Sequence, residues 1–335
     1  MKKRPLGNSG LTASIVGLGA WVLGGGQLWG KDTDDAESVR TIQAALDLGI
    51  NLIDTAPGYG WGRSEQVVGR ALKGRRDKAI VATKCGIWWE DSRGSYFADL
   101  DGRKVNRSLR PDTIRIEIEN SLRRLDTDCV DLYQTHWPSA PPDFTPIADT
   151  MAELLKLKEQ GKIRAIGVSN VSLDELKENV RCGAIATDQV RYSMLHREAE
   201  QDILPYCAQH KLGTLTYMSL EQGLLTGKIG MDRQFAPGEF RSNPAWNDWL
   251  IPANRRRVLK LLASWEDLTA KYRCTLSQLV IAWTAAQTGV THVLAGARNL
   301  TQLSENAKAG ELELEAADLT RIRKDVSALG EPVKA

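Results

Sequence analysis

The chain of 335 residues has no surplus of charge of either sign and no long apolar run. Its 44 basic and 42 acidic residues leave a formal net charge of +2. Proteins that bind nucleic acid or anionic membranes usually carry a clear excess of positive charge. No apolar run approaches the roughly 18 residues that cross a bilayer. These absences predict a protein with neither a nucleic-acid partner nor a membrane partner.

Cysteine is sparse, and its spacing carries no motif. The five cysteines, an odd number, include no C-x-x-C pair, which argues against a disulfide framework and against a zinc ribbon. His196, His210 and His292 stand apart from carboxylates and cysteines at metal-binding spacing, so we expect no metal. Free thiols suit a reducing compartment, and no small-residue cleavage site follows the basic start of the chain. A cytoplasmic location is therefore the expectation.

Two segments resemble nucleotide-binding motifs, but neither matches its motif completely. The glycines between positions 17 and 26 do not form G-x-G-x-x-G, because position 22 is valine. The segment 223–229 resembles a P-loop, but its spacing is short by one residue and no Ser or Thr follows the lysine. The sequence therefore supports neither a Rossmann site nor a P-loop.

The main positive signal is a regular alternation of short apolar runs and amphipathic stretches. Eight such strand-helix units follow one another without a break in composition, and eight repeats favour a closed α/β barrel over two open sheets. We therefore predict a single (β/α)8 domain over residues 1–335. Residues 2–6 and 11–13 are expected to form a hairpin over the barrel floor. The connections 85–109, after the third strand, and 219–253, after the seventh, are long enough to indicate binding or lid functions.

Four ionisable residues fall where the predicted strands end. Asp54 ends the second strand, and Tyr59 lies in the loop after it; Lys84 ends the third strand and His136 the fourth. In such a barrel the active site lies at the carboxyl ends of the strands, so these side chains are expected to converge. Buried charges are costly unless paired, which makes Asp54 and Lys84 natural partners. Each residue alone could serve stability only, but the four together predict a site of chemistry.

The chemistry expected of this set is proton transfer by Tyr59. A lysine ammonium beside a phenol stabilises its ionised form, so Lys84 is expected to lower the pKa of Tyr59 towards neutral pH. Asp54 would orient the lysine, and His136 would hold a carbonyl oxygen or relay the proton. The four residues thus predict acid–base chemistry on a carbonyl compound.

Three longer motifs resemble those of a known family. Residues 54–65 with Gly69 match the pattern D-T-A-x-x-Y-x-x-G-x-S-E-x-x-x-G. Residues 131–138 match D-L-Y-x-x-H-W-P, and residues 161–170 match G-K-I-R-x-I-G-V-S-N. On these motifs the chain resembles the aldo-keto reductases, from its N-terminal hairpin to about Asn306.

The resemblance implies an enzyme that reduces an aldehyde or ketone to the alcohol with hydride from NAD(P)H. In this interpretation Tyr59 is the general acid, Lys84 and Asp54 tune it, and His136 orients the substrate. Two other functions are known for similar barrels: an epimerase that keeps its NADP and oxidises then re-reduces one sugar carbon, and a redox-sensing auxiliary subunit of a potassium channel. No feature of the sequence favours either alternative, and the sequence does not predict the oligomeric state.

The same resemblance implies which residues would hold the nicotinamide and the pyrophosphate. Ser169, Asn170 and Gln189 would bind the nicotinamide amide, and the ring of Tyr217 would stack on the nicotinamide. A loop over 219–228 would let backbone amides approach the pyrophosphate. Its expected contacts are Ser219, Leu220, Gly223, Leu225, Gly227 and Lys228. The alternative for this segment is an ordinary lid loop.

The adenosine half of the cofactor would lie after the eighth predicted strand. The expected contacts there are Gly296, Arg298, Gln302, Glu305 and Asn306. The guanidinium of Arg298 can fork onto an adenosine 2′-phosphate, which favours NADPH. Many members of the family carry a further basic residue where this chain has Gln302, so NADH stays an alternative.

Tryptophans are expected to wall the substrate pocket. Trp21 follows the first strand, Trp88 and Trp89 follow the third, and Trp137 follows the predicted catalytic histidine. Aromatic faces suit the C–H faces of sugars as well as apolar aldehydes. The small-molecule substrate is therefore predicted to be a sugar or a sugar-derived carbonyl compound.

Overall fold

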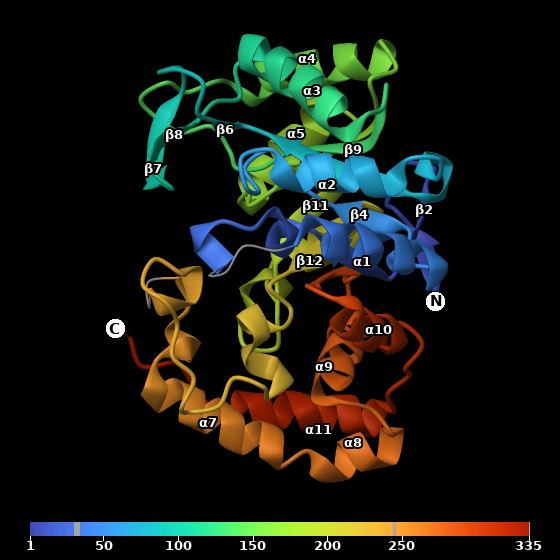
Figure 1. Ribbon diagram of the computed structural model, residues 1–335, viewed down its shortest axis with the longest axis vertical. Coiled ribbons are helices and arrows are strands. Elements are labelled where there is room, and N and C mark those ends of the chain that lie inside the picture. Colours follow the sequence, from blue (N-terminus) through green and yellow to red (C-terminus); the bar gives the residue numbers. More distant parts are fainter. Residues whose placement is uncertain (30–33, 244–245, 335) are drawn as a thin grey trace.

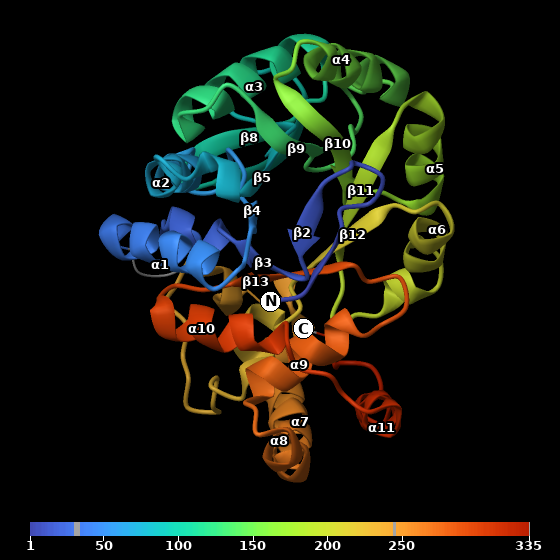
Figure 2. The ribbon, with the colours of Figure 1, turned by 90° about the vertical axis from the view of Figure 1, so that its right-hand side faces the viewer.

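Eight parallel strands form a closed barrel in the structure, a computed structural model that describes residues 1–29, 34–243 and 246–334. Their order around the ring is β3, β4, β5, β9, β10, β11, β12 and β13. Their bounds are Val16–Gly19, Leu52–Asp54, Ile80–Cys85, Val130–Thr135, Ile163–Ser169, Ile185–Arg191, Gly213–Tyr217 and His292–Gly296. Helices surround the ring (Figure 2). The predicted (β/α)8 barrel is confirmed.

Each barrel strand leads into helix, and β12 leads into three helices in succession. The helices are α1 (Asp35–Asp47), α2 (Arg63–Leu72), α3 (Pro111–Leu125), α4 (Ile147–Glu159), α5 (Leu173–Cys182), α6 (Ile203–Gln209), α7 (Pro252–Ala263), α8 (Glu266–Tyr272), α9 (Leu276–Ala285), α10 (Leu300–Ala309) and α11 (Ala316–Ser327). Side chains at the N-cap position stabilise the first turn of several of these helices. Ser172 and Thr275 open α5 and α9 with capping boxes, and Asp34 accepts a hydrogen bond from the Ala36 amide at the start of α1.

The N-terminal hairpin closes the floor of the barrel, as predicted. Its strands are β1 (Lys3–Pro5) and β2 (Thr12–Ser14), which pair antiparallel. Leu6 is fully buried beneath the barrel interior. Gly7 adopts φ +56°, and a Cβ there would stand 1.9 Å from the carbonyl oxygen of Ala186. Only glycine lets the turn approach β11 so closely.

The long connection after β5 contains a small sheet that the sequence did not reveal. Residues 85–109, expected to be a loop, include β6 (Ile87–Trp88), β7 (Ser95–Leu100) and β8 (Arg103–Arg107), which pair antiparallel in the order β6-β8-β7. These strands were missed because they are short and mixed in polarity, so they show no sustained period of two.

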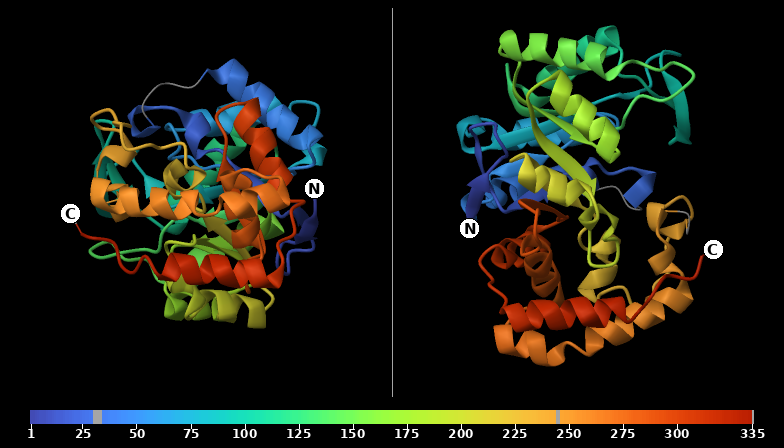
Figure 3. Two further views of the ribbon diagram at one scale, coloured as in Figure 1. Left: turned by 90° about the horizontal axis from the view of Figure 1, so that it is seen from below. Right: turned by 180° about the vertical axis from the view of Figure 1, so that it is seen from behind.

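The connection after β12 is built from single turns of 3-10 helix: η5 (Glu221–Thr226), η6 (Phe240–Ser242) and η8 (Asp248–Leu250). After β3 come two more, η1 (Trp21–Gly24) and η2 (Gln27–Trp29). Figures 1 and 3 show these insertions at the end of the barrel opposite the N-terminus. Within the described ranges, no helix is long and apolar enough to cross a membrane.

The buried carboxylate of Asp131 in β9 ties three neighbouring segments together. One oxygen accepts hydrogen bonds from the Val81 amide, at 2.9 Å, and from Arg76 Nη2, at 2.6 Å. The other accepts from Arg164 Nη1 at 2.8 Å. The side chain is only 1% exposed, so these bonds replace its contacts with water.

We expect Asp131→Asn to lower the free energy of unfolding by about 2 kcal/mol, because it breaks a buried charge pair while both arginines keep some contact with water. Urea denaturation followed by circular dichroism measures the change. Asp174→Asn is the matched control, since that carboxylate is 96% exposed and its partner lies at 3.5 Å. Equal urea midpoints for Asp131→Asn and Asp174→Asn would contradict the stabilising role given to Asp131.

Candidate active site

The four strand-end residues predicted from the sequence lie together at the carboxyl end of the barrel. Lys84 is fully buried in β5. Its Nζ donates to Asp54 Oδ1 at 2.6 Å, to the Thr55 carbonyl at 2.9 Å and to Tyr59 Oη at 3.3 Å. All three hydrogens of the ammonium are used, so its direction is fixed. The lysine therefore holds the phenol at a set place relative to Asp54.

Two glutamine side chains complete the shell of Asp54. Its Oδ2 accepts from Gln189 Nε2 at 2.7 Å and from Gln134 Nε2 at 3.2 Å. Sequence reasoning assigned Gln189 to the cofactor and missed Gln134. The available signal was an amide side chain inside a predicted barrel strand, where a buried amide needs a partner.

Close backbone packing fixes the loop that carries Tyr59. Gly60 adopts φ +63°, and a Cβ there would stand 2.1 Å from the carbonyl oxygen of Gly24. Ser64 bonds to Thr55 Oγ1 at 2.8 Å and donates to the Ala20 carbonyl at 2.9 Å. The loop after β4 is therefore attached to the turn after β3. The position of the phenol depends on both segments.

His136 presents a neutral imidazole beside the phenol. The rings of His136 and Tyr59 meet edge to face, with centroids 5.8 Å apart. Burial, aided by the positive charges of Lys84 and Arg107, holds the pKa of His136 well below its usual value. Its buried Nδ1 has no hydrogen-bond partner among the described residues. His136 is also one of the residues that line the cavity beside Tyr59.

The sequence-based prediction of a lowered pKa for Tyr59 was wrong. Burial and the negative charge of Asp54 raise the pKa of Tyr59 well above its ordinary value. Lys84 does not reverse this shift because its ammonium is bound to Asp54, whose opposite charge offsets its effect on the phenol. The phenol is protonated at neutral pH, the state that a proton donor requires.

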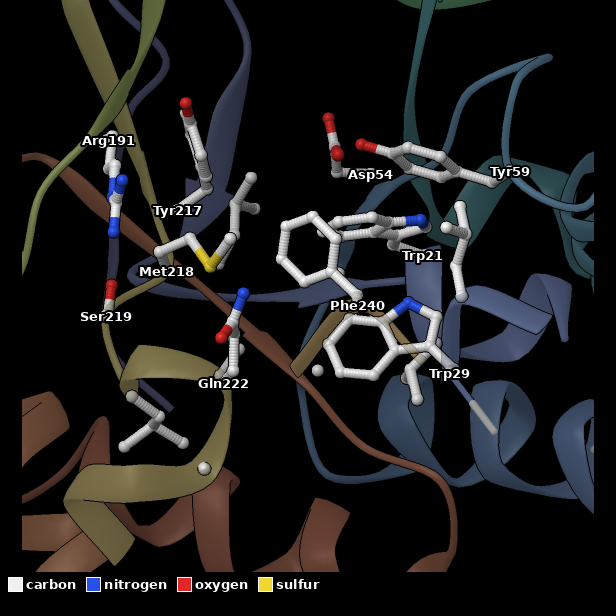
Figure 4. Close-up of a pocket in the computed structure, with 18 of the residues that line it drawn as sticks. Trp21, Trp29, Asp54, Tyr59, Arg191, Tyr217, Met218, Ser219, Gln222 and Phe240 are labelled. Atoms are coloured by element: carbon white, nitrogen blue, oxygen red, sulfur yellow. The ribbon is translucent and has the colours of Figure 1, made fainter. Parts of the chain in front are cut away.

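A cavity of about 520 Å³ opens beside these four residues. Around Tyr59 its wall is aromatic: Trp21 lies against Tyr59 at 5.8 Å between ring centroids, and Phe240 meets Trp21 at 5.1 Å. Figure 4 shows Asp54 and Tyr59 on one side of the view, with Trp21, Trp29 and Phe240 below them. The wall beside the phenol is therefore largely aromatic.

The predicted substrate tryptophans divide into two pairs. Trp21 and Trp137 line the cavity, whereas the wall that the described residues form includes neither Trp88 nor Trp89. Trp88 is buried and donates its Nε1 hydrogen to Asp91 at 2.8 Å. Trp89 packs edge to face on another tryptophan outside the cavity. The sequence-based prediction placed Trp88 and Trp89 in the cavity wall, which was wrong because the small sheet after β5 turns both side chains away from the barrel mouth.

Other aromatic residues form the part of the wall that Trp88 and Trp89 were predicted to form. The additional aromatic residues are Trp29, Phe97, Phe240 and Trp246. They come from the insertions after β3, β5 and β12, whose positions relative to one another no local pattern reveals. Sequence reasoning gave none of these four to the substrate pocket.

Most residues assigned to the cofactor by resemblance also line this cavity. They are Asn170, Gln189, Tyr217, Ser219, Leu220, Gly223, Lys228, Gly296, Arg298, Gln302, Glu305 and Asn306. Three others are not part of its lining: Ser169 and Leu225 are buried, and Gly227 follows η5 with φ +72°. The cavity therefore extends from the four strand-end residues to the start of α10.

Hydrogen bonds hold the predicted nicotinamide contacts next to the catalytic set. Tyr217 Oη donates to Asn170 Oδ1 at 2.6 Å, and Asn170 Nδ2 donates to the His136 carbonyl at 2.9 Å. Ser169 Oγ donates to the Gln189 carbonyl at 2.7 Å. An aromatic ring thus stands beside amide groups that can donate and accept, as a planar carboxamide ring requires.

Charged residues gather at the other end of the cavity. Arg298 donates to the Trp29 carbonyl at 2.9 Å and lies 5.7 Å from the centroid of the Trp29 ring. Lys228 and Glu305 form an ion pair at 2.7 Å. Two buried polar atoms of cavity residues, Gln222 Nε2 and Glu305 Oε1, lack hydrogen-bond partners in the described structure. A long polar ligand with an apolar ring end fits this arrangement.

Comparison with known proteins assigns the family. Residues 15–326 match the family described as the Aldo/keto reductase family. The chain belongs to this family. Its members use nicotinamide cofactors, and the chain is therefore an oxidoreductase of the aldo-keto reductase type.

Three relatives show how far the likeness extends. The NADH-specific methylglyoxal reductase of Escherichia coli (strain K12) is 44% identical over 330 residues, covering 98% of this chain and 99% of that protein. The glycerol dehydrogenase AKR11B4 from Gluconobacter oxydans has a TM-score of 0.85 at 38% identity, covering 99% and 97% of the two chains. The aldo/keto reductase from Klebsiella pneumoniae in complex with NADP and acetate has a TM-score of 0.72 at 26% identity, covering 100% and 98%.

We expect Tyr59 to remain protonated near pH 10, where an ordinary tyrosine is about half ionised. Its pKa is raised by burial and by Asp54, so ionisation moves to higher pH. The ultraviolet absorbance of phenolate, recorded for the wild type and for Tyr59→Phe across a pH titration, isolates this residue by difference. A difference signal that grows between about pH 7 and pH 9 would show a lowered pKa and contradict the assignment.

Proposed function

We propose that this protein reduces a small aldehyde or ketone to the alcohol with a nicotinamide dinucleotide. The observation that carries the proposal is the protonated phenol of Tyr59, held 3.3 Å from Lys84 Nζ beside an aromatic-walled cavity. A proton donor in a dry site beside a cation suits the conversion of a carbonyl oxygen to a hydroxyl.

Each of the four residues has a distinct part in this reaction. Tyr59 donates its hydroxyl proton to the substrate oxygen, and the ammonium of Lys84 stabilises the phenolate that remains. Asp54 fixes the lysine through the 2.6 Å bond. The neutral ring of His136, which has one N–H donor and one acceptor nitrogen, orients the carbonyl group. The raised pKa of Tyr59 keeps the proton in place until the substrate oxygen gains negative charge.

The dinucleotide, when bound, supplies the hydride that reduces the carbonyl carbon. Asn170, Gln189 and Tyr217 are the residues that would hold its nicotinamide end, because their polar groups and ring lie beside the catalytic set. The loop from Ser219 to Lys228 would hold the phosphates, and Arg298 would lie at the adenosine end. Contact with both ends would place the cofactor along the whole cavity.

The preferred substrate is a short carbonyl compound with few hydroxyl groups. The cavity wall near Tyr59 includes the apolar rings of Trp21 and Phe240. Hydroxyls of an intact sugar that face these rings would lose water without gaining a partner. The similarity to a methylglyoxal reductase supports a short 2-oxoaldehyde. The broader prediction of a sugar-derived carbonyl stays a prediction. A screen of NADPH and NADH oxidation over 2-oxoaldehydes, short aldehydes, ketoses and aldoses ranks these classes directly.

We expect Tyr59→Phe to lower kcat by roughly 100- to 10,000-fold, the usual contribution of a general acid. The affinity for the dinucleotide should change little, because the phenol hydroxyl contacts Lys84 and not the predicted cofactor residues. Steady-state kinetics and fluorescence titration measure the two quantities. Tyr96→Phe serves as control, since Tyr96 is 56% exposed. Full turnover by Tyr59→Phe would reject the mechanism.

NADPH is the proposed cofactor, with NADH as the alternative. Arg298 lies over the ring of Trp29, 5.7 Å from its centroid, and brings a positive charge to this part of the cavity. Arg241, 5.8 Å from the same centroid, is already paired with Glu239. The charge of Arg298 supports the binding of a 2′-phosphate. The Gln302 side chain and the similarity to an NADH-specific relative support NADH.

We expect Arg298→Gln to weaken NADPH binding by roughly 10- to 100-fold, as for loss of a hydrogen bond to a charged group. NADH binding should change by much less, because NADH lacks the 2′-phosphate. Isothermal titration calorimetry with each dinucleotide gives both constants. If Arg298→Gln weakened the binding of NADPH and NADH equally, the role of Arg298 would instead be to hold Trp29 in place.

A further inference from the structure

Arg191, at the end of β11, faces the cavity with hydrogen-bonding capacity to spare. It lines the cavity beside Tyr217 and Ser219, and its side chain is 32% exposed. Its Nη2 lies 3.5 Å from Glu221 Oε2. Its Nε is buried and has no hydrogen-bond partner within the described part of the chain. Nη2 also lies 3.5 Å from His196 Nδ1. A guanidinium has five donors, two of them on Nη1, so Arg191 can bind a second anion while it keeps Glu221.

Glu221 is held rigidly in the loop that follows β12. Its side chain is fully buried. It accepts hydrogen bonds from Ser193 Oγ at 2.5 Å, from His196 Nδ1 at 2.9 Å and from Asn247 Nδ2 at 2.9 Å. Burial by itself would raise the pKa of Glu221, but the bonds and charges of His196, Arg191 and Ser193 outweigh it and lower the pKa. The carboxylate is therefore ionised.

The network of Glu221 joins three separate segments beneath the cavity. Ser193 and His196 follow β11, Glu221 begins η5, and Asn247 precedes η8. Glu221 has φ +45°, and Gln222 after it has φ +57°. Such left-handed backbone is strained for residues other than glycine. The bonds of the carboxylate hold this loop in a shape that presents Ser219 and Gln222 to the cavity.

Arg191 lies on the side of the cavity away from the proton donor. Figure 4 shows Arg191 and Ser219 together at one side, Asp54 and Tyr59 at the other, and Tyr217 and Met218 between them. β11 and β12 place Arg191 directly opposite Tyr217 in register. A carbonyl group bound at Tyr59 would be separated from Arg191 by the ring of Tyr217. The guanidinium is therefore placed for the phosphate part of the dinucleotide and not for the reacting carbonyl.

We propose that Arg191 binds the pyrophosphate of the nicotinamide dinucleotide and that Glu221 is the positioning residue that holds Arg191 for this contact. The inference rests on the proposed binding of a dinucleotide in this cavity. The pyrophosphate is common to NADH and NADPH, so the contribution of Arg191 is the same for both. This separates it from Arg298, whose proposed contact exists only in NADPH.

The test measures the dissociation constants of NADH, NADPH and ADP-ribose by calorimetry. We expect Arg191→Gln to weaken all three by the same factor, roughly 10- to 100-fold, because all three contain the pyrophosphate. Arg191→Lys keeps the charge and should lose less. Arg298→Gln is the matched control, since it should affect NADPH selectively. Thermal unfolding of each variant shows whether the fold is retained.

Glu221 is tested in a double-mutant cycle. We expect Glu221→Gln to weaken binding of all three ligands by roughly tenfold in the wild type and to have little further effect in the Arg191→Gln background. A residue that only stabilised the fold would give independent losses in both backgrounds. Additive losses would therefore overturn the positioning role.

The outcomes also separate this inference from the proposed function. Unchanged binding of NADH by folded Arg191→Gln overturns the inference alone. A loss for NADH without a loss for ADP-ribose also overturns it, because it places Arg191 at the nicotinamide. Failure of the wild-type protein to bind any of the three ligands overturns both the inference and the proposed function. Equal losses support Arg191 even if no carbonyl substrate is reduced.

Discussion

The ion pair between Lys84 and Asp54 is the constraint on which the rest of the site depends. Both side chains lie almost entirely out of water, so every donor and acceptor must find a partner inside the barrel. The ammonium uses its hydrogens on Asp54, Thr55 and Tyr59, and two glutamines complete the carboxylate. A closed ring of parallel strands keeps these groups in register. The phenol is thereby held at one place and in one protonation state.

The insertions at the carboxyl ends of the strands turn this arrangement into a cavity with two unlike ends. Aromatic rings from three insertions line the cavity, with Trp21 next to Tyr59. The charged residues Arg298, Lys228 and Glu305 line another part of it. Arg191, paired with the buried Glu221, lies beside Ser219 on the side of the cavity away from Tyr59. An apolar end beside a proton donor and a polar end with spare hydrogen-bond donors are what a carbonyl compound and a dinucleotide respectively need.

Local pattern predicted the barrel, its floor hairpin and the meeting of the four catalytic candidates, because strand period, turn residues and strand ends are properties of short segments. Local pattern did not predict the features that depend on packing between segments far apart in the chain. The small sheet after β5 turned Trp88 and Trp89 away from the cavity. The Gln134 side chain in β9 reaches Asp54 in β4 past the intervening strand β5. The pKa of Tyr59 moved opposite to expectation, because the prediction counted the charge of Lys84 without its neutralising partner and without burial.

The sequence by itself determined the family, the eight strand-helix units and the identity of the residues at the strand ends, since each is written in contiguous motifs. Only the tertiary structure decided which aromatic rings face the cavity, which way the pKa of Tyr59 moves, and that Glu221 lies next to Arg191. Those outcomes depend on distances between segments far apart in the chain and on the exclusion of water from charged groups. Both the distances between these segments and the exclusion of water are set only when the barrel closes.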